Sequence, residues 1–473
     1  MYRKLHVHMA SFLALLLVLL SACQLTPEEE PVVNKGDGVY EQKLSEAQAT
    51  AAPDANGQAA ASAAAPVPTA APDPYLTQPH WQEAIAFRNF AIDIDVDVEA
   101  PEAGLFPVYA VEGADFADGD ARVAQVLDCL LEDVVGVRPG GDTREEVYRV
   151  MQAMLQGQYD EASGRFIPPS DDEAERIVSE MTELAATAPT ADSYEPAPGI
   201  EPVATGTHRA YKLANGEEWD VRIEPDALTV QRLPGGAVQP ERWVLEGAAV
   251  AGETPHPLEH VELTQAEAEA IVADFLERAD IGTFGVSLME KARIVRNYTG
   301  ETISEGYRFE CTRVGGDCLP FSFRQYSGGN SLRFSDDAYA PGLPQETMTL
   351  YVDGDGVRQF VWTAPLTIVE QAAQNIELLP FDQMQSLIRQ ALRASLSWTG
   401  DKQSGSVFSG GRVTRVVLSA CCIPQKDAPG RFYLTPAWFV LVSLNELEAK
   451  GALPQAIAIN AVDGSRIAIE KAY

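Results

Sequence analysis

Between residues 90 and 99 the chain alternates apolar and acidic residues with a period of two. Such alternation predicts a β-strand that buries one face and exposes the other. The apolar positions are Ile92, Ile94, Val96 and Val98, and the acidic positions are Asp93, Asp95 and Asp97. Successive carboxylates on one strand face lie roughly 7 Å apart, which is too far to share one divalent cation easily. We therefore interpret the acidic row as a solvated face that also hinders edge-to-edge pairing. A second strand is expected at residues 105–112.

Three amphipathic helices are predicted after these strands. Apolar residues recur at helical spacing from Val123 to Val134, with Cys129 beside the stripe. Thr143-x-x-Glu146 and Ser170-x-x-Glu173 have capping-box spacing and predict the starts of the other two helices. The apolar stripes of these two helices contain Met151, Met154 and Met181. Methionines can line a binding groove, but this spacing is more typical of ordinary core, and we adopt the core interpretation.

From His208 the pattern changes to short strands joined by turns. Asn215-Gly216 and the run at residues 353–356 each separate two apolar strands and predict tight hairpins. The second run contains two aspartates but does not continue into a calcium-loop pattern, so we predict a turn. Helices are expected after Thr264, which forms a capping box with Glu267, and at residues 381–396. Further strands are expected at residues 286–295, 413–418, 431–434, 439–444, 456–459 and 466–469.

The N-terminus has the pattern of a secretory signal. Arg3 and Lys4 precede an apolar run at residues 12–20, which is shorter than the roughly 20 residues that span a bilayer. The run ends in Leu20-Ser21-Ala22-Cys23, which resembles a bacterial lipobox. This resemblance implies removal of the signal peptide at residues 1–22 and attachment of a diacylglyceryl group to the sulfur of Cys23. The alternative is a plain secretory signal with a chance cysteine.

Two or three acyl chains would hold the protein on a bilayer almost permanently, because each buried methylene contributes about 0.8 kcal/mol. Residues 23–79 are then the lipidated N-terminus and a linker that is dominated by Ala, Pro, Gln and Ser between residues 47 and 74. Such a segment cannot bury enough apolar surface to offset its ordering entropy. We predict a disordered stalk with a root-mean-square span of roughly 40 Å, and a folded part that begins near His80.

Composition indicates a globular multidomain protein and argues against one class of partner. The chain has 473 residues, 46% of them hydrophobic, which allows two or three domains with real cores. Its 35 Lys and Arg against 69 Asp and Glu give a net charge of -34, which argues against nucleic acid as a partner. We predict an α+β fold with an N-terminal α+β domain at residues 80–200, a β-rich middle domain with a helix at 201–340, and a C-terminal α+β domain at 341–473.

Two segments resemble a known family. The helix opening at residues 263–268 (LTQAEA) is similar to the start of PepSY-type extracytoplasmic modules, in which a helix packs on a small antiparallel sheet. Residues 433–438 (YLTPAW) and 459–465 (INAVDGS) are similar to the closing strands and turn of such modules. The whole arrangement resembles uncharacterised lipoproteins of clostridial-type Gram-positive bacteria. The resemblance implies PepSY-like units in the C-terminal half and a regulatory or binding role at the cell surface, and it carries over no catalytic residue.

The sequence contains none of the common catalytic or nucleotide-binding motifs, and we predict no cofactor and no metal. His256 and His260 stand four residues apart beside Glu259, as two zinc ligands on a helix would. Two prolines disfavour a helix there, so we interpret this segment as a polar loop.

Among the remaining cysteines, we expect one disulfide candidate and several free thiols. Cys311 and Cys318 flank Gly315-Gly316, and a disulfide between them would stabilise the fold by about 2.5 kcal/mol. This pairing is predicted as a candidate bridge. Cys421 and Cys422 are adjacent, so we expect one of them to face the core as a free thiol, and we expect Cys129 in the core of its helix.

These features favour a lipid-anchored protein on the extracytoplasmic face of the cell membrane, with palmitate-type chains on Cys23. Its partners are the bilayer and an envelope protein or ligand of unidentified chemistry. A binding or regulatory role is the leading hypothesis, and enzymatic activity is not expected. One alternative is a cell-envelope hydrolase that uses two acidic residues on opposite sides of its substrate. Another is the solute-binding component of a transporter.

Overall fold

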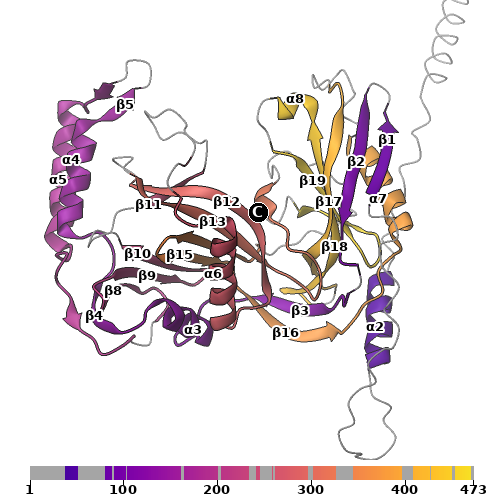
Figure 1. Ribbon diagram of the computed structural model, residues 1–473, viewed down its shortest axis with the longest axis horizontal. Coiled ribbons are helices and arrows are strands. Elements are labelled where there is room, and N and C mark those ends of the chain that lie inside the picture. The colour runs from indigo at the N-terminus through magenta and orange to yellow at the C-terminus, as the bar shows by residue number, and fades with distance from the viewer. Residues whose placement is uncertain are drawn as a thin grey trace, which may run out of the picture.

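The computed structural model describes residues 38–51, 80–87, 90–102, 104–160, 165–200, 204–233, 241–245, 258, 261–296, 302–325, 345–396, 408–426, 428–449 and 453–469. The fold is α+β, with two large sheets and flanking helices (Figure 1). Cys23, His256 and His260 lie outside the described residues. No helix among those residues is long and apolar enough to cross a membrane.

The first lobe is built on an eight-stranded sheet. Its strands are β1 (His80–Ala86), β2 (Ala91–Glu99), β3 (Val108–Gly113), β16 (Leu366–Ala373), β17 (Gly411–Pro424), β18 (Arg431–Leu444), β19 (Gln455–Asn460) and β20 (Arg466–Ile467). The main path runs β1-β2-β17-β18-β19-β20, and β3 pairs with both β16 and β18. Only the β2–β17 pair is parallel among the pairs described. Three helices belong to this lobe: α2 (Val39–Ala51), α7 (Phe381–Leu396) and α8 (Asn445–Glu448).

The second lobe is built on a ten-stranded sheet in the order β11-β12-β13-β14-β15-β10-β9-β8-β4-β7. Its strands are β4 (Val134–Pro139), β7 (Glu195–Pro196), β8 (His208–Leu213), β9 (Glu218–Glu224), β10 (Ala227–Leu233), β11 (Glu241–Leu245), β12 (Phe284–Arg296), β13 (Thr302–Arg313), β14 (Thr347–Asp353) and β15 (Gly356–Thr363). Helices α3 (Ala121–Leu130) and α6 (Gln265–Arg278) pack their apolar stripes on one face of this sheet and form its core.

A helical hairpin projects from the second lobe. Helices α4 (Arg144–Gln156) and α5 (Asp171–Thr187) pack on each other at the end of the molecule farthest from the first lobe (Figure 1). A small sheet of β5 (Gln158–Asp160) and β6 (Arg165–Ile167) joins them. We call residues 143–188 the arm.

The strand pairing does not follow the domain boundaries predicted near residues 200 and 340. Strands β2 and β3, expected in a domain ending at residue 200, pair with strands from the C-terminal part of the chain. Strands β14 and β15, expected in the domain 341–473, belong to the second sheet. The second lobe is therefore an insertion between β3 and β16. Local patterns predict individual strands, but strand partners this far apart in sequence leave no local signal.

The connection between the lobes is itself packed. After β13 the chain makes a turn at Gly315-Gly316 and a short 3₁₀ helix (Phe323–Gln325), and it inserts Cys318 and Phe321 into the core of the first lobe. The ring of Phe321 stacks on Phe439 with centroids 4.3 Å apart. The amide of Leu319 donates to the carbonyl of Leu418 at 3.0 Å. A segment that follows a strand of the second lobe therefore contributes side chains to the core of the first lobe.

Part of the predicted stalk is ordered. Helix α2 lies within residues 23–79 and buries Tyr40 and Leu44 in the core of the first lobe. Lys43 Nζ donates to the carbonyl of Val462 at 3.0 Å. The prediction of disorder is wrong for residues 38–51, because two apolar side chains four residues apart are enough to dock one helical face on an existing core. Residues 24–37 and 52–79 lie outside the described residues.

Many local predictions agree with the structure, but the helix expected through Val134 ends at Leu130, and the strands expected at residues 431–434 and 439–444 form one strand, β18. The capping boxes of Thr143 with Glu146 and of Thr264 with Glu267 form as expected, and Ser170 caps α5. The Asn215-Gly216 and Asp353–Gly356 turns close antiparallel hairpins. Strand β2 buries its apolar row and exposes its aspartates, but it is flanked by β1 and β17 and is not an edge strand.

Candidate functional site

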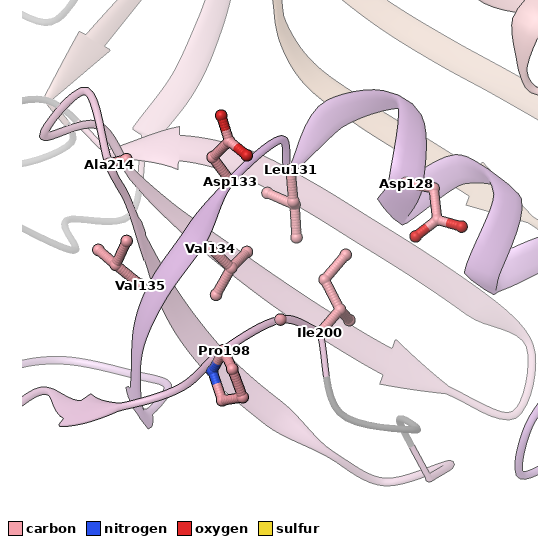
Figure 2. Close-up of a pocket in the computed structure, with 9 residues that line it drawn as sticks. Asp128, Leu131, Asp133, Val134, Val135, Pro198, Ile200 and Ala214 are labelled. Carbon is pink, nitrogen blue, oxygen red and sulfur yellow. The ribbon is translucent and has the colours of Figure 1, made fainter.

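The second lobe carries an open pocket of about 450 Å³ between α3, β4 and the segment after β7 (Figure 2). Its lining residues are Asp128, Leu131, Asp133, Val134, Val135, Pro198, Gly199, Ile200 and Ala214. Leu131 and Val134 are buried beneath it, whereas 48% of Val135 is exposed. An exposed valine beside a buried apolar floor offers contact to an apolar group.

Chain geometry shapes the pocket. Helix α3 ends when the amide of Leu131 donates to the carbonyl of Leu127, and Asp133 then turns the chain into β4 with φ +55°. Aspartate tolerates this left-handed conformation better than most residues. The carbonyl of Asp133 accepts from the amide of Ala214 at 3.0 Å, and the carbonyl of Val135 accepts from the amide of Ala197 at 3.1 Å. These bonds hold three chain segments around the depression.

The rim of the pocket is acidic. The side chains of Asp128 and Asp133 are exposed, and the last turn of α3 contains no basic residue. Because the C-terminal end of a helix carries partial negative charge, it adds to the field of the two carboxylates. The pocket therefore offers an apolar floor and a negatively charged edge, an arrangement that suits a ligand with a cationic group beside an apolar part.

A second polar cluster lies at the base of the arm. His208 Nε2 lies 2.8 and 2.9 Å from the two carboxylate oxygens of Asp220. Burial raises the pKa of nearby Asp142, and the negative charge of Asp220 adds to this effect while His208 opposes it. Within the described residues, the ring of His208 hydrogen-bonds to Asp220, and no hydroxyl or thiol nucleophile is bonded to it.

His80 forms a further pair of contacts on the first lobe. Its ring nitrogens lie 3.0 Å from Asp95 Oδ1 and 2.9 Å from Asp97 Oδ1, and hydrogen bonding to Asp97 raises the pKa of the imidazole. All three side chains are well exposed. In the described part of the chain, no group of three or more His, Cys, Asp or Glu side chains is placed to hold a metal ion.

The predicted Cys311–Cys318 bridge is wrong. Both residues carry free thiols, and they lie in different cores: Cys311 in that of the second lobe and Cys318 in that of the first. The predicted turn forms between them, with the amide of Cys318 donating to the carbonyl of Gly315. Cys311 is fixed in strand β13, however, and the turn directs Cys318 into the core of the first lobe rather than back toward Cys311. Cys421 and Cys422 are free, with Cys421 buried as expected, and Cys129 is half-buried at the edge of the second core.

The methionines of the arm were predicted to be core residues, and this prediction is wrong. Met154 is 37% exposed, and Met151 and Met181 are half-buried. The two helices of the arm pack on each other, and parts of their apolar stripes remain exposed.

The comparisons with known proteins place no family on this chain. No family model matches, and no curated protein matches. Among solved structures, the chain is similar to an uncharacterized protein from Eubacterium rectale, with a TM-score of 0.41 and 11% sequence identity, over 82% of this chain and 93% of that one.

Sequence reasoning missed both the pocket and the Asp142–His208–Asp220 cluster. Residues of the pocket come from three separate segments, 128–135, 198–200 and 214, and those of the cluster come from the β4–α4 turn, β8 and β9. Val135, an apolar residue in a short strand, was the one local feature that pointed to the pocket. Its exposure, however, depends on which strands pair with β4.

Proposed function

We propose that this chain is an extracytoplasmic lipoprotein, anchored through Cys23, that binds a ligand in the α3–β4 pocket. The anchor rests on the lipobox-like sequence at residues 20–23. The observation that carries the binding role is the pocket, which combines an apolar floor with two exposed carboxylates. PepSY-like units remain part of the proposal, and the packing of α6 and α7 on antiparallel strands is compatible with them.

Ligand chemistry follows from the lining. A primary amine would gain attraction at Asp128 and Asp133, and an alkyl chain would cover Val135 and Pro198. n-Hexylamine combines both parts, 1-hexanol has only the apolar part, and hexanoate carries the opposite charge. We expect n-hexylamine to give the strongest saturation-transfer NMR signal of the three, because apolar contact and charge attraction then act together.

Three variants test the site. Asp133→Asn should weaken n-hexylamine binding about three- to fivefold, as expected for one exposed charge pair. Val135→Thr keeps the side-chain shape and should weaken binding of both n-hexylamine and 1-hexanol. Asp93→Asn removes an exposed carboxylate on the first lobe and should leave binding unchanged. Equal signals from all three probes, or equal losses in Asp93→Asn and Asp133→Asn, would rule out this pocket as the binding site.

The Asp142–His208–Asp220 cluster favours a second candidate, the cell-envelope hydrolase. A carboxyl with a raised pKa near a second carboxyl is the kind of pairing that acid–base catalysis uses. Trp362, whose exposure in a groove would support a carbohydrate substrate, is buried, and Trp398 lies outside the described residues. Hydrolysis of cell-wall glycan that is lost in Asp142→Asn would favour this candidate, and the absence of turnover by folded protein would remove it.

A further inference from the structure

The arm exposes apolar side chains that its own packing leaves uncovered. Tyr148, Met154, Val178 and Leu184 are 40%, 37%, 41% and 48% exposed. On α4, Tyr148, Met151 and Leu155 stand at i, i+3 and i+7, so they lie on one helical face. On α5, Val178 and Met181 are similarly aligned, and only Ile177 and Ala185 are fully buried in that helix. A two-helix hairpin with this exposure presents a partly apolar docking face.

Methionine gives this face a particular character. Its unbranched thioether side chain adapts to different partner surfaces and is frequent where amphipathic helices dock. Met154 is exposed, and Met151 and Met181 are half-buried, so three adaptable side chains line the two helices.

The charge of the arm selects the partner. Helix α5 contains six acidic residues and one arginine, and the arm as a whole contains ten acidic and four basic residues. A second copy of this chain is disfavoured, because each copy carries a net charge of -34. Anionic lipid is disfavoured for the same reason. The complementary surface is a helix that is basic on one side and apolar on the other.

We propose that the arm binds a basic amphipathic helix of a partner protein, independently of the α3–β4 pocket. The apolar side of that helix lies on the exposed apolar side chains of the arm, among them Met154, Val178 and Leu184, and its Lys or Arg residues meet the carboxylates of α5. The arm projects from the second lobe (Figure 1), so a partner helix can reach it without displacing either core.

The test uses the full chain without its signal peptide and a fluorescent 14-residue peptide of Leu and Lys in helical register. We expect saturable binding, measured by fluorescence anisotropy, that weakens as salt is raised. The triple variant Met154→Gln, Val178→Gln, Leu184→Gln keeps good helix formers on the surface, and it should weaken binding about tenfold or more. The double variant Ile368→Gln, Leu453→Gln changes exposed apolar residues outside the arm and should bind like the parent protein.

Additional controls test whether an acidic helix or a lipid surface binds to the arm instead. A Leu/Glu peptide of the same pattern should not bind, and neutral or anionic lipid vesicles should not sediment the protein through the arm. Circular dichroism checks that the triple variant keeps its helices. Equal affinities of the triple and double variants, or vesicle binding that depends on Met154, Val178 and Leu184, would overturn the proposal. Loss of n-hexylamine binding bears on the pocket alone and leaves this result unaffected.

Discussion

The indole Nε1 of Trp362 donates a hydrogen bond of 3.0 Å to Oε1 of Glu346. The same carboxylate accepts from Arg313 and from the backbone amide of Leu366, the first residue of β16. Glu346 is almost fully buried and lies where the chain passes from the second sheet to the first. One carboxylate therefore joins β13, β15 and β16 at the lobe junction.

Removing this carboxylate should destabilise the protein strongly. Glu346→Ala leaves the guanidinium of Arg313, the indole of Trp362 and the amide of Leu366 without their acceptor, and we expect a loss of about 3–5 kcal/mol. Urea unfolding measures it. Glu377→Gln, at an exposed position, should change stability by less than about 0.5 kcal/mol. A loss for Glu346→Ala no larger than that of the control would contradict the role of Glu346 at the junction.

Asp142 should make stability depend on pH with a defined sign. Burial and the charge of Asp220 raise the pKa of Asp142 in the folded state, so the folded state keeps this proton over a range where the unfolded state has released it. The contribution of protonated Asp142 to the free energy of unfolding is then lost as pH rises from the ordinary carboxyl pKa through the raised pKa of the folded state. Asp142→Asn should therefore become more stable relative to the parent protein as pH rises through and above the ordinary carboxyl pKa of about 4.

Urea titrations of both proteins at several pH values measure this difference. If the difference in the free energy of unfolding between the two proteins stayed constant with pH, Asp142 would not be the source of the pH dependence. Asp93→Asn serves as the control, since Asp93 is an exposed residue of β2.

The cysteines give a chemical test of the two-core arrangement. Burial raises the pKa of the Cys311 and Cys318 thiols to about 12, and a thiol reacts through its thiolate. Iodoacetamide should therefore modify neither residue in native protein, and both residues after unfolding without a reductant. Mass spectrometry of the tryptic peptides measures this. A disulfide-linked Cys311–Cys318 peptide would contradict the structure.

Local features of the fold are predictable from the sequence, and long-range ones are not. The alternation in β2, the capping boxes at Thr143 and Thr264 and the Asn215-Gly216 turn all depend on residues within a few positions of each other. The parallel pairing of β2 with β17 joins residues more than 300 positions apart, and no pattern in either strand names its partner.

The arm and the candidate site show the same limit. The apolar stripes of α4 and α5 predict amphipathic helices, but the exposure of Met154 depends on how the rest of the chain packs around the hairpin. The docking of Tyr40 on the first core likewise depends on an element far along the chain. Burial is a property of the assembled fold, so a stripe alone does not distinguish a core from a docking face.

Labelling with a palmitate analogue tests the proposed lipid anchor on Cys23. In a bacterial host that processes lipoproteins, the parent protein should incorporate the label and stay in the membrane fraction at high salt, since the attachment is hydrophobic. Cys23→Ala should lose the label, while Cys129→Ala should keep it. Label that persists in Cys23→Ala, or release of the parent protein by salt alone, would contradict a lipid anchor on Cys23.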